Sequence, residues 1–470
     1  MKSPAFHELS AVELTGAIRR REVSAREALE AHFDRIDAVN GTINAVITED
    51  RENALVLADA ADELTLSGAD LPPLHGLQMT HKDTHNTKGL RTTQGSTVFK
   101  DFVPEFDDLI ITRLKKAGVV TTGKTNVPEF AAGSHTFNEV FGTTVNPYDT
   151  TRSAGGSSGG VAASIAARIQ PLGDGSDMGG SLRIPASFCN VVGYRPSIGV
   201  VPSLPTRNAW AWLARHGLMA RDVEDIALGM TAIAGADPAI PYAYPVAGSF
   251  GVSLERDLTG LRIGWSPDFG LGVPVDREVL RVLEGQLQVF TDLGAIVEQA
   301  APDLRDADQV FGATRAFDFV LGLGELVQKH GEAIKPEIRW NVEQGLQLTA
   351  QDLVDAALAR TRLDAGVRRF FGKYDVFASP AAQVLPFDAT ERYPTSVNGV
   401  EFETYLDWMR SACLVSATGL PAVSVPAGFS DDGLPVGLQL AMPHGSDVDL
   451  LQVAYAFEQA TGWAKRAPEL

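Results

Sequence analysis

Residues 153–169 read SAGGSSGGVAASIAARI, and the first eight of them are only serine, alanine and glycine. A second cluster of the same kind, GDGSDMGGSLRIPAS, follows at residues 173–187. Flexible linkers rich in glycine and serine border polar, mobile sequence, whereas the first cluster runs directly into a predicted helix, VAASIAAR. We therefore interpret these glycines as places where backbone approaches a ligand closely, and not as a linker.

Two short motifs match other chemistries but lack the structural context that each requires. Residues 156–160 fit G-x-S-x-G, which would make Ser158 a nucleophile on a strand-to-helix turn. The preceding residues 146–154 are polar and turn-like instead of a buried strand, and no later histidine up to His444 pairs clearly with an acid. Residues 118–125 fit G-x-x-x-x-G-K-[ST], but VVTT within them is typical of a strand. We expect neither a nucleophile elbow nor a nucleotide site.

A lysine upstream of both clusters could serve as a base. Lys82 lies in PLHGLQMTHKDTHNTKGLRTTQGS, residues 73–96, after a short apolar segment and before a turn. Most lysines are on the surface, but burial lowers the pKa of a lysine and leaves a neutral amine that can accept a proton. His81 and His85 are four residues apart on this strand and turn, which is not expected to bring them to one face. We expect structural histidines and no metal site.

The rest of the chain alternates predicted helices and strands. Ser10–Glu13 and Ser24–Glu27 fit the capping box, so a helix is expected after each, the second ending near Asn40-Gly41. Another helix is expected through residues 109–118. Short strands rich in β-branched residues are predicted at VVTT (119–122), LRIGW (261–265), GAIVE (294–298), YDVFASP (374–380) and AVSVPAGF (422–429). This alternation indicates an α/β protein.

Composition narrows the class of partner. Of 470 residues, 44% are hydrophobic and 21% charged, and no apolar run is long enough to span a membrane. The net charge of −19 opposes binding to nucleic acid or anionic membranes. The start, MKSPAFHELSAVEL, resembles no leader peptide, so a cytoplasmic location is expected. The two cysteines, Cys189 and Cys413, are expected to be buried thiols.

Taken together, the serine clusters and the upstream lysine resemble the amidase signature family, and the resemblance covers most of the chain. The matching stretches are residues 76–96, KKAGVVTTGKTNVPEFAAGS (115–134), FGTTVNPYDTTRSAGGSSGGVAASIAA (141–167), GDGSDMGGSLRIPASFCNVVGYRPSIGVVP (173–202), YDVFASP (374–380) and TGLPAVSVPAGFSDDGLPVGLQL (418–440).

The resemblance implies roles for individual residues. The family's catalytic lysine falls on Lys82, its cis-serine on Ser157 and its acyl-accepting nucleophile on Ser181, which follows Ser157 by 24 residues as in the family. The implied oxyanion hole consists of the backbone amides of Met178, Gly179, Gly180 and Ser181. Supporting roles are implied for Ser158, Asp177 and Arg183. His81 and Met178 depart from the residues that the family commonly has there, but neither is a reacting group.

The resemblance also implies the fold, a single α/β/α domain with a large, mixed, twisted central sheet flanked by helices. We expect an N-terminal helical segment over about residues 1–70, a catalytic core over about 71–235 and a variable part of the same domain over about 236–470. The run Asp237–Gly248, rich in proline and alanine, is the best candidate for a boundary.

The implied activity is hydrolysis of a C–N bond in a small amide or carbamate, and also of esters, through an acyl-enzyme without metal or cofactor. Aromatic residues that could line an apolar substrate pocket, although each could equally be core, are Phe137, Phe141, Trp210 and Trp212. The alternative within the family is the glutaminase-like subunit of a tRNA-dependent amidotransferase. A binding scaffold with a vestigial site is disfavoured because all three reacting positions are filled. The sequence leaves a homodimer open.

Overall fold

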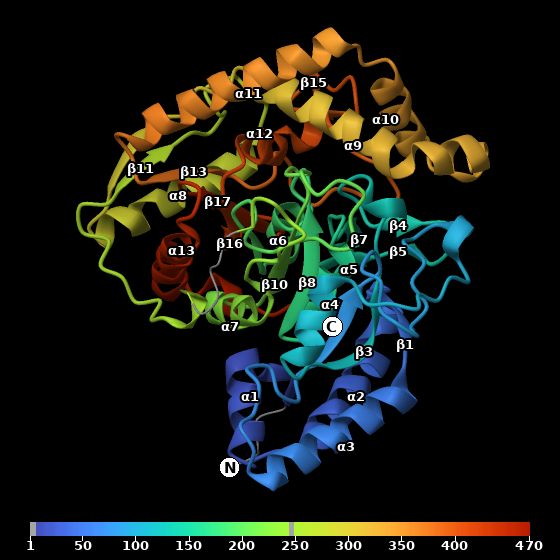
Figure 1. Ribbon diagram of the computed structural model, residues 1–470. Helices are drawn as coiled ribbons and strands as arrows, with labels where there is room; N and C mark the ends of the chain where they lie inside the picture. The colour runs from blue at the N-terminus through green and yellow to red at the C-terminus, as the bar shows by residue number, and fades with distance from the viewer. Residues whose placement is uncertain (1–5, 244–248) are drawn as a thin grey trace.

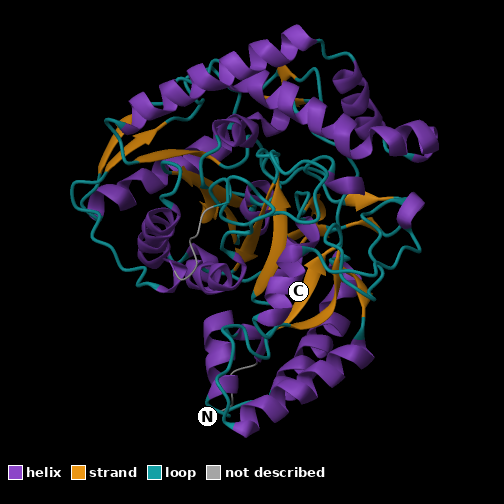
Figure 2. Cartoon of the chain, viewed as in Figure 1, coloured by secondary structure: helices purple, strands orange, loops and turns teal. Residues whose placement is uncertain are grey.

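The central feature of the computed structural model, which describes residues 6–243 and 249–470, is an eight-stranded sheet (Figure 1, Figure 2). Its order is β12-β11-β13-β17-β16-β9-β10-β8, in which β11 runs parallel to β12 and β13 and the other pairs are antiparallel. In sheet order, the strands are Ile296–Gln299, Arg262–Trp265, Val376–Pro380, Pro435–Ala441, Ala422–Phe429, Val192–Arg195, Arg215–Ala220 and Leu172–Asp177. The predicted mixed sheet flanked by helices is confirmed.

A smaller sheet of three strands lies beside the edge strand β8. Its order is β1-β3-β2, with β1 at Val46–Glu49, β3 at Val120–Thr125 and β2 at Gln78–Lys82. Where the two sheets meet, the Lys82 N–H donates to the side-chain carboxylate of Asp174 on β8 at 3.2 Å, and not to a backbone carbonyl oxygen of that strand. The predicted strands are therefore divided between two sheets.

Helices cover both faces of the large sheet. On β10, Gly217 faces Leu182, next to α6, whereas Leu218 faces Gly229 of α7. Adjacent residues of a strand point to opposite faces, so α6 and α7 lie on opposite sides. The long helices α9 and α11 lie side by side across the top of Figure 1. The helices after residue 100 are α4 (Leu109–Lys116), α5 (Gly159–Ala166), α6 (Arg183–Cys189), α7 (Val223–Ile233), α8 (Arg277–Asp292), α9 (Ala307–His330), α10 (Pro336–Leu346), α11 (Ala350–Phe371), α12 (Arg410–Thr418) and α13 (Asp447–Thr461).

The N-terminal helices are α1 (Ala11–Arg19), α2 (Ala25–Ile43) and α3 (Arg51–Ser67). Both predicted capping boxes are present, at Ser10 and at Ser24. The predicted end of α2 at Asn40-Gly41 is three residues early. Asn40 stays helical because its side chain accepts from the N–H groups of Ala45 and Val46, and Asn44 takes the left-handed conformation that ends the helix.

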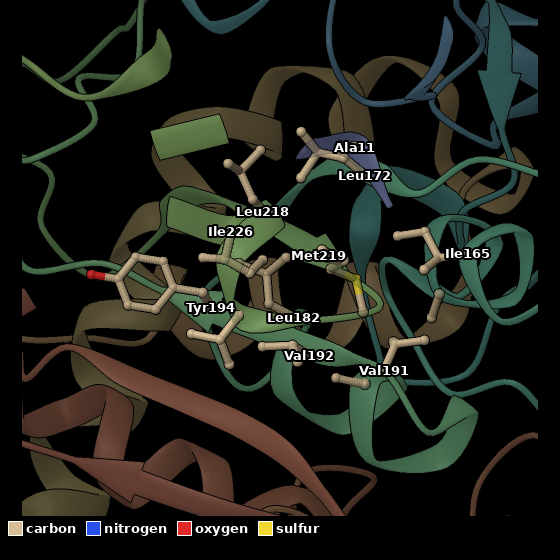
Figure 3. Close-up of a cluster of buried hydrophobic side chains, with 14 of the residues drawn as sticks. Ala11, Ile165, Leu172, Leu182, Val191, Val192, Tyr194, Leu218, Met219 and Ile226 are labelled. Atoms are coloured by element: carbon tan, nitrogen blue, oxygen red, sulfur yellow. The ribbon is translucent and has the colours of Figure 1, made fainter. Parts of the chain in front are cut away.

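The core beside β8 fixes the position of both serine clusters. Figure 3 shows side chains that meet there from β8, β9, β10, α5 and α7, among them Ile165, Leu172, Val192, Leu218 and Ile226, all fully buried. Each such side chain stabilises the fold by about 1.5–3 kcal/mol. Because α5 begins next to the first cluster and β8 ends at the second, this core holds the two clusters together.

The structure tests the prediction that residues 146–154 are polar and turn-like. Residues 146–154 are not simply turn-like, since β6 (Val145–Asn146) and β7 (Asp149–Ser153) form a hairpin closed by ladder pairing. Other short strands are β4 (Phe137–Asn138), β5 (Gly142–Thr143), β14 (Ser396–Val397) and β15 (Val400–Glu401).

Both cysteines are free and buried, as predicted. Of the candidate boundary, residues 244–248 lie outside the described residues. Within the described chain, no helix has the length and apolar character that crossing a membrane requires.

Candidate active site

Lys82 ends strand β2 with a fully buried side chain. Its Nζ donates to Ser157 Oγ at 2.8 Å, Ser158 Oγ at 2.9 Å and Ser176 Oγ at 3.0 Å. The structure thus brings Lys82 together with two of the residues that the sequence singled out. The sequence analysis missed Ser176, although it directly precedes Asp177 in the second cluster.

Burial determines the protonation of this lysine. Burial lowers the pKa of Lys82 to about 7, although the carboxylates of Asp177 and Asp174 favour its charged form. Loss of hydration disfavours an ammonium ion in such a place, and here that effect exceeds the attraction of both carboxylates. A substantial fraction of Lys82 is therefore a neutral amine near neutral pH, as a general base requires.

The first serine cluster forms a tight turn ahead of α5. The peptide bond between Gly156 and Ser157 is cis. Gly155 has a φ of +75°, and a Cβ there would lie 2.8 Å from the Cα of Pro185, so only glycine fits. The Ser158 N–H donates to the carbonyl oxygen of Ser181 at 3.2 Å. This bond joins the two clusters and sets the turn with Ser157 against the segment with Ser181.

Ser181 lies between β8 and α6 and is 7% exposed, whereas Ser157 is fully buried. In the preceding turn, Gly180 has a φ of +104°, and a Cβ there would lie 2.5 Å from that of Ala412. The Gly180 N–H donates to Asp177 Oδ1 at 2.8 Å. Of the four amides predicted for the oxyanion hole, that of Gly180 is therefore bonded to Asp177, whereas those of Met178, Gly179 and Ser181 are the other three.

Asp177 and Arg183 form a buried ion pair that holds this turn. Arg183 Nη2 is 2.9 Å from Asp177 Oδ1 and its Nε is 3.0 Å from Oδ2. Arg183 also donates to Gln439 Oε1 and Ser416 Oγ, each at 2.6 Å. Although burial opposes its ionisation, Arg183 and Arg195 hold the pKa of Asp177 well below its usual range. The sequence analysis missed Gln439, Ser416 and Arg195, which no local motif marks.

The expectation for His81 and His85 is wrong in one respect. The two rings do converge, because each Nδ1 hydrogen-bonds one oxygen of Asp174, at 2.6 Å and 2.5 Å. His85 lies beyond the end of β2, where the turn redirects its side chain. Over residues 6–243 and 249–470, no three histidine, cysteine or carboxylate side chains are placed to hold a metal ion.

A cavity lined by Met178 of the second cluster adjoins a second cavity. Met178, Trp212, Tyr242 and Asp318 line a cavity of about 300 Å³, and Trp212 and Asp318 also line a neighbouring one of about 790 Å³ that includes Trp210. Their shared walls make them one groove, hereafter the Met178 groove.

The predicted pocket residues Phe137 and Phe141 lie elsewhere. Phe137 is on β4 and lines a separate cavity, with the Nζ of Lys335 4.4 Å from its ring centre. The Phe141 ring is covered by the guanidinium of Arg91, 5.1 Å from the ring centre. Neither ring lines the Met178 groove.

Comparison with known proteins gives relatives along the whole chain. An acylamidase of Rhodococcus erythropolis is 36% identical over 100% of this chain and 98% of that protein. A glutamyl-tRNA(Gln) amidotransferase subunit of Moorella thermoacetica is also 36% identical, over 99% of both chains.

Solved structures agree with these relatives. A bacterial aryl acylamidase of the amidase signature enzymes superposes with a TM-score of 0.92 at 28% identity, over 98% of both chains. A 6-aminohexanoate cyclic dimer hydrolase superposes with a TM-score of 0.86 at 27% identity, over 98% of this chain and 99% of that one. The family model "Amidase" matches residues 27–451. The chain therefore belongs to the amidase signature family and is an amide-hydrolysing enzyme.

Proposed function

We propose that the chain hydrolyses the C–N bond of a small apolar or aryl amide or carbamate, and of related esters, with Ser181 as nucleophile. The observation that carries this proposal is the 2.8 Å hydrogen bond between the buried Lys82 Nζ and Ser157 Oγ. A buried amine next to a hydroxyl has few structural uses, but it can pass a proton through that hydroxyl.

The proton relay begins at the nucleophile. As Ser181 Oγ bonds to the carbonyl carbon, its proton moves to Ser157 Oγ and the proton of Ser157 moves to Lys82 Nζ. The tetrahedral intermediate then collapses as the C–N bond breaks, while Ser157 protonates the departing nitrogen and Lys82 returns its proton to Ser157. Water attacks the acyl ester through the same relay, which releases the acid and restores Ser181.

The charge that develops on the carbonyl oxygen requires donors that are already in place. We propose the amides of Met178, Gly179 and Ser181, since the Gly180 amide is bound to Asp177. Each such donor typically contributes about 3 to 4 kcal/mol of transition-state stabilisation. The ion pair of Asp177 with Arg183 keeps this turn rigid, so the donors need no reorganisation during reaction.

The Met178 groove supports an apolar or aryl substrate. Its wall at Met178 belongs to the proposed oxyanion turn, and Trp212 and Tyr242 supply aromatic faces beside it. The guanidinium of Arg360 lies 3.6 Å from the ring centre of Trp212 and fixes that ring. The part of the groove lined by Met178 has a volume of about 300 Å³, which fits a single aromatic ring, and the neighbouring part adds about 790 Å³ for a larger substituent.

The relatives leave a second function within the family, because the acylamidase and the amidotransferase protein have the same identity to this chain. Hydrolysis by the purified chain alone separates the two, with anilides, aryl carbamates, primary amides, esters and glutamine as substrates. We expect turnover of anilides or aryl carbamates without added partners. Glutaminase activity that appears only with partner proteins and tRNA would favour the amidotransferase instead. A cytoplasmic location and a homodimer remain predictions.

Replacing Trp212 by alanine is expected to raise KM for an anilide roughly 10-fold, with a smaller change in kcat. The reason is loss of apolar contact in the groove worth about 1.4 kcal/mol. Initial-rate kinetics measure both constants. Phe141→Ala is the matched control because its ring lies outside the groove. Equal changes in KM for the two variants would contradict a role for Trp212 in substrate binding.

A further inference from the structure

We infer that Asp174, held by His81 and His85, is a positioning residue that supplies the buried counter-charge for Lys82 when Lys82 takes up a proton. The inference rests on the proposed function, because it takes Lys82 as the base. Asp174 lies on β8 two residues before Ser176, whose hydroxyl oxygen accepts a hydrogen bond from Lys82 Nζ. The lysine is thus held between its hydroxyl partners and the strand that carries this carboxylate.

The carboxylate of Asp174 accepts three hydrogen bonds. His81 Nδ1 donates to Oδ1 at 2.6 Å, His85 Nδ1 donates to Oδ2 at 2.5 Å, and the Lys82 backbone N–H donates to Oδ2 at 3.2 Å. Charge-assisted bonds of this length favour the ionised carboxylate. Although burial opposes ionisation, the two rings hold the pKa of Asp174 well below its usual range. Asp174 is fully buried, so solvent does not screen its charge.

The partners of Asp174 do not cancel that charge. Burial lowers the pKa of His81, so its ring is neutral and donates through Nδ1 only. His81 Nε2 lies 3.0 Å from Thr121 Oγ1, which can donate to it. His85 Nε2 is buried with no partner among the described residues, so a proton there would be an unsatisfied donor. Each ring donates through Nδ1 to this one carboxylate, and neither ring bonds a second carboxylate in the part of the chain that the structure describes.

Asp177 is the other carboxylate near Lys82, and its situation is different. Asp177 is paired with Arg183 and lies 3.4 Å from Arg195, so two guanidinium groups neutralise it. Other titratable groups on segments packed around Lys82 include Asp83 next to it in sequence, Lys124 on β3, His216 on β10 and His32 on α2. Burial lowers the pKa of Lys124, His216 and His32 and raises the pKa of Asp83, so it opposes the charged form of each group. Unlike Asp177, Asp174 forms no ion pair with a lysine or arginine of the described residues, and its partners are the two histidines.

This charge has its largest effect when Ser157 gives its proton to Lys82. The new ammonium ion forms on a fully buried side chain, where an opposite charge nearby is worth far more than in solution. The backbone bond from Lys82 to Asp174 also fixes the end of β2, from which the side chain reaches Ser157. Asp174 therefore stabilises the protonated form of the base and aligns it.

The test measures how fast a fluorophosphonate labels Ser181 between pH 5 and pH 9, in the full chain and its D174N variant. Labelling falls on acidification as Lys82 becomes protonated. Without the Asp174 charge, the ammonium ion is less stable, so this fall is expected about one pH unit lower. The plateau rate is expected to fall roughly 10- to 100-fold because the relay creates an unpaired charge. If the labelling rate of a folded D174N variant, as shown by its thermal melt, fell at the same pH as that of the wild type, the inference would be overturned.

A second pair of variants keeps the inference testable if D174N does not fold. H85N retains an amide donor close to the place of Nδ1, whereas H85L has a similar size and no donor. We expect H85N to stay within about 3-fold of the wild-type plateau rate and H85L to lose roughly 10-fold. Equal rates and equal pH profiles for the pair would contradict the inference.

Failure of the proposed function is distinguishable from failure of this inference. Wild-type labelling rates in Lys82→Met would refute Lys82 as the base, whatever Asp174 does. An inactive Lys82→Met variant together with an unchanged profile in D174N would refute the role of Asp174 alone.

Discussion

Alanine at position 181 is expected to lower kcat/KM by at least about 10⁴-fold for any substrate that the chain hydrolyses. The neighbouring hydroxyls of Ser157 and Ser158 are not expected to accept the acyl group in its place, because both are fully buried while Ser181 is 7% exposed. The variant should fold normally, since the backbone bond from Ser158 to residue 181 uses the carbonyl oxygen and not the side chain. Steady-state kinetics and thermal melting measure these two expectations.

Covalent labelling identifies the nucleophile directly. A fluorophosphonate is expected to modify Ser181 in the wild-type chain and to leave Ser181→Ala unmodified, with peptide mass mapping as the measurement. Ser158→Ala is the matched serine control, because its Oγ also contacts Lys82 Nζ, at 2.9 Å, yet it is not proposed to react. An adduct on Ser157 or Ser158 would contradict the assignment of Ser181 as the nucleophile. It would favour the G-x-S-x-G interpretation of residues 156–160 instead.

The chemistry of the site was the part most accessible from sequence. Ser157, Ser158, Asp177 and Ser181 lie within two short clusters, where spacing along the chain fixes spacing in the turn. Lys82 is farther away in sequence; the residues alone suggested it as a possible base, and the family resemblance implied its role together with those of the serines. The structure adds the 2.8 Å contact with Ser157, which no local pattern could supply.

What the sequence did not predict depends on contacts between distant segments. Arg183 is held by Ser416 and Gln439, more than 200 residues later in the chain. His81 and His85 meet at Asp174 because β2 lies against β8, and neighbouring strands of different sheets cannot be aligned from periodicity alone. The resemblance implied the Gly180 amide as part of the oxyanion hole, and nothing in GDGSDMGGS shows that the Asp177 side chain folds back onto this amide.

For the fold, too, local features could be predicted from the sequence and contacts between distant segments could not. Strands such as Val120–Thr125 and Ala422–Phe429 were predicted because β-branched residues mark buried strands. Their assignment to two separate sheets was not predicted, since it depends on which backbone groups pair, and any apolar strand can pair with any other. The hairpin of β6 and β7 was missed because its strands are short and mostly polar, so no run of β-branched residues marks them.

Replacing Lys82 by methionine is expected to lower the labelling rate of Ser181 and kcat/KM by roughly 10³-fold or more, the size typical of a lost general base combined with a broken relay. Methionine has a similar length and no amine, and it removes the cost of burying one, so the variant should melt at or above the wild-type temperature. Because burial lowers the pKa of Lys82 to about 7, the wild-type rate should fall below that pH as the amine is protonated. The residual rate of Lys82→Met should lack this fall.

Lys82→Arg decides whether the lysine acts as a base or only as a positive charge that orders the hydroxyls. Arginine retains the charge and can donate to Ser157, Ser158 and Ser176, but in proteins it does not give up its proton. A folded Lys82→Arg variant as inactive as Lys82→Met would therefore support proton transfer by Lys82. If the lysine only ordered the hydroxyls, arginine would restore most of the activity. Substantial activity in Lys82→Arg would assign the lysine an electrostatic role and require another base for Ser181.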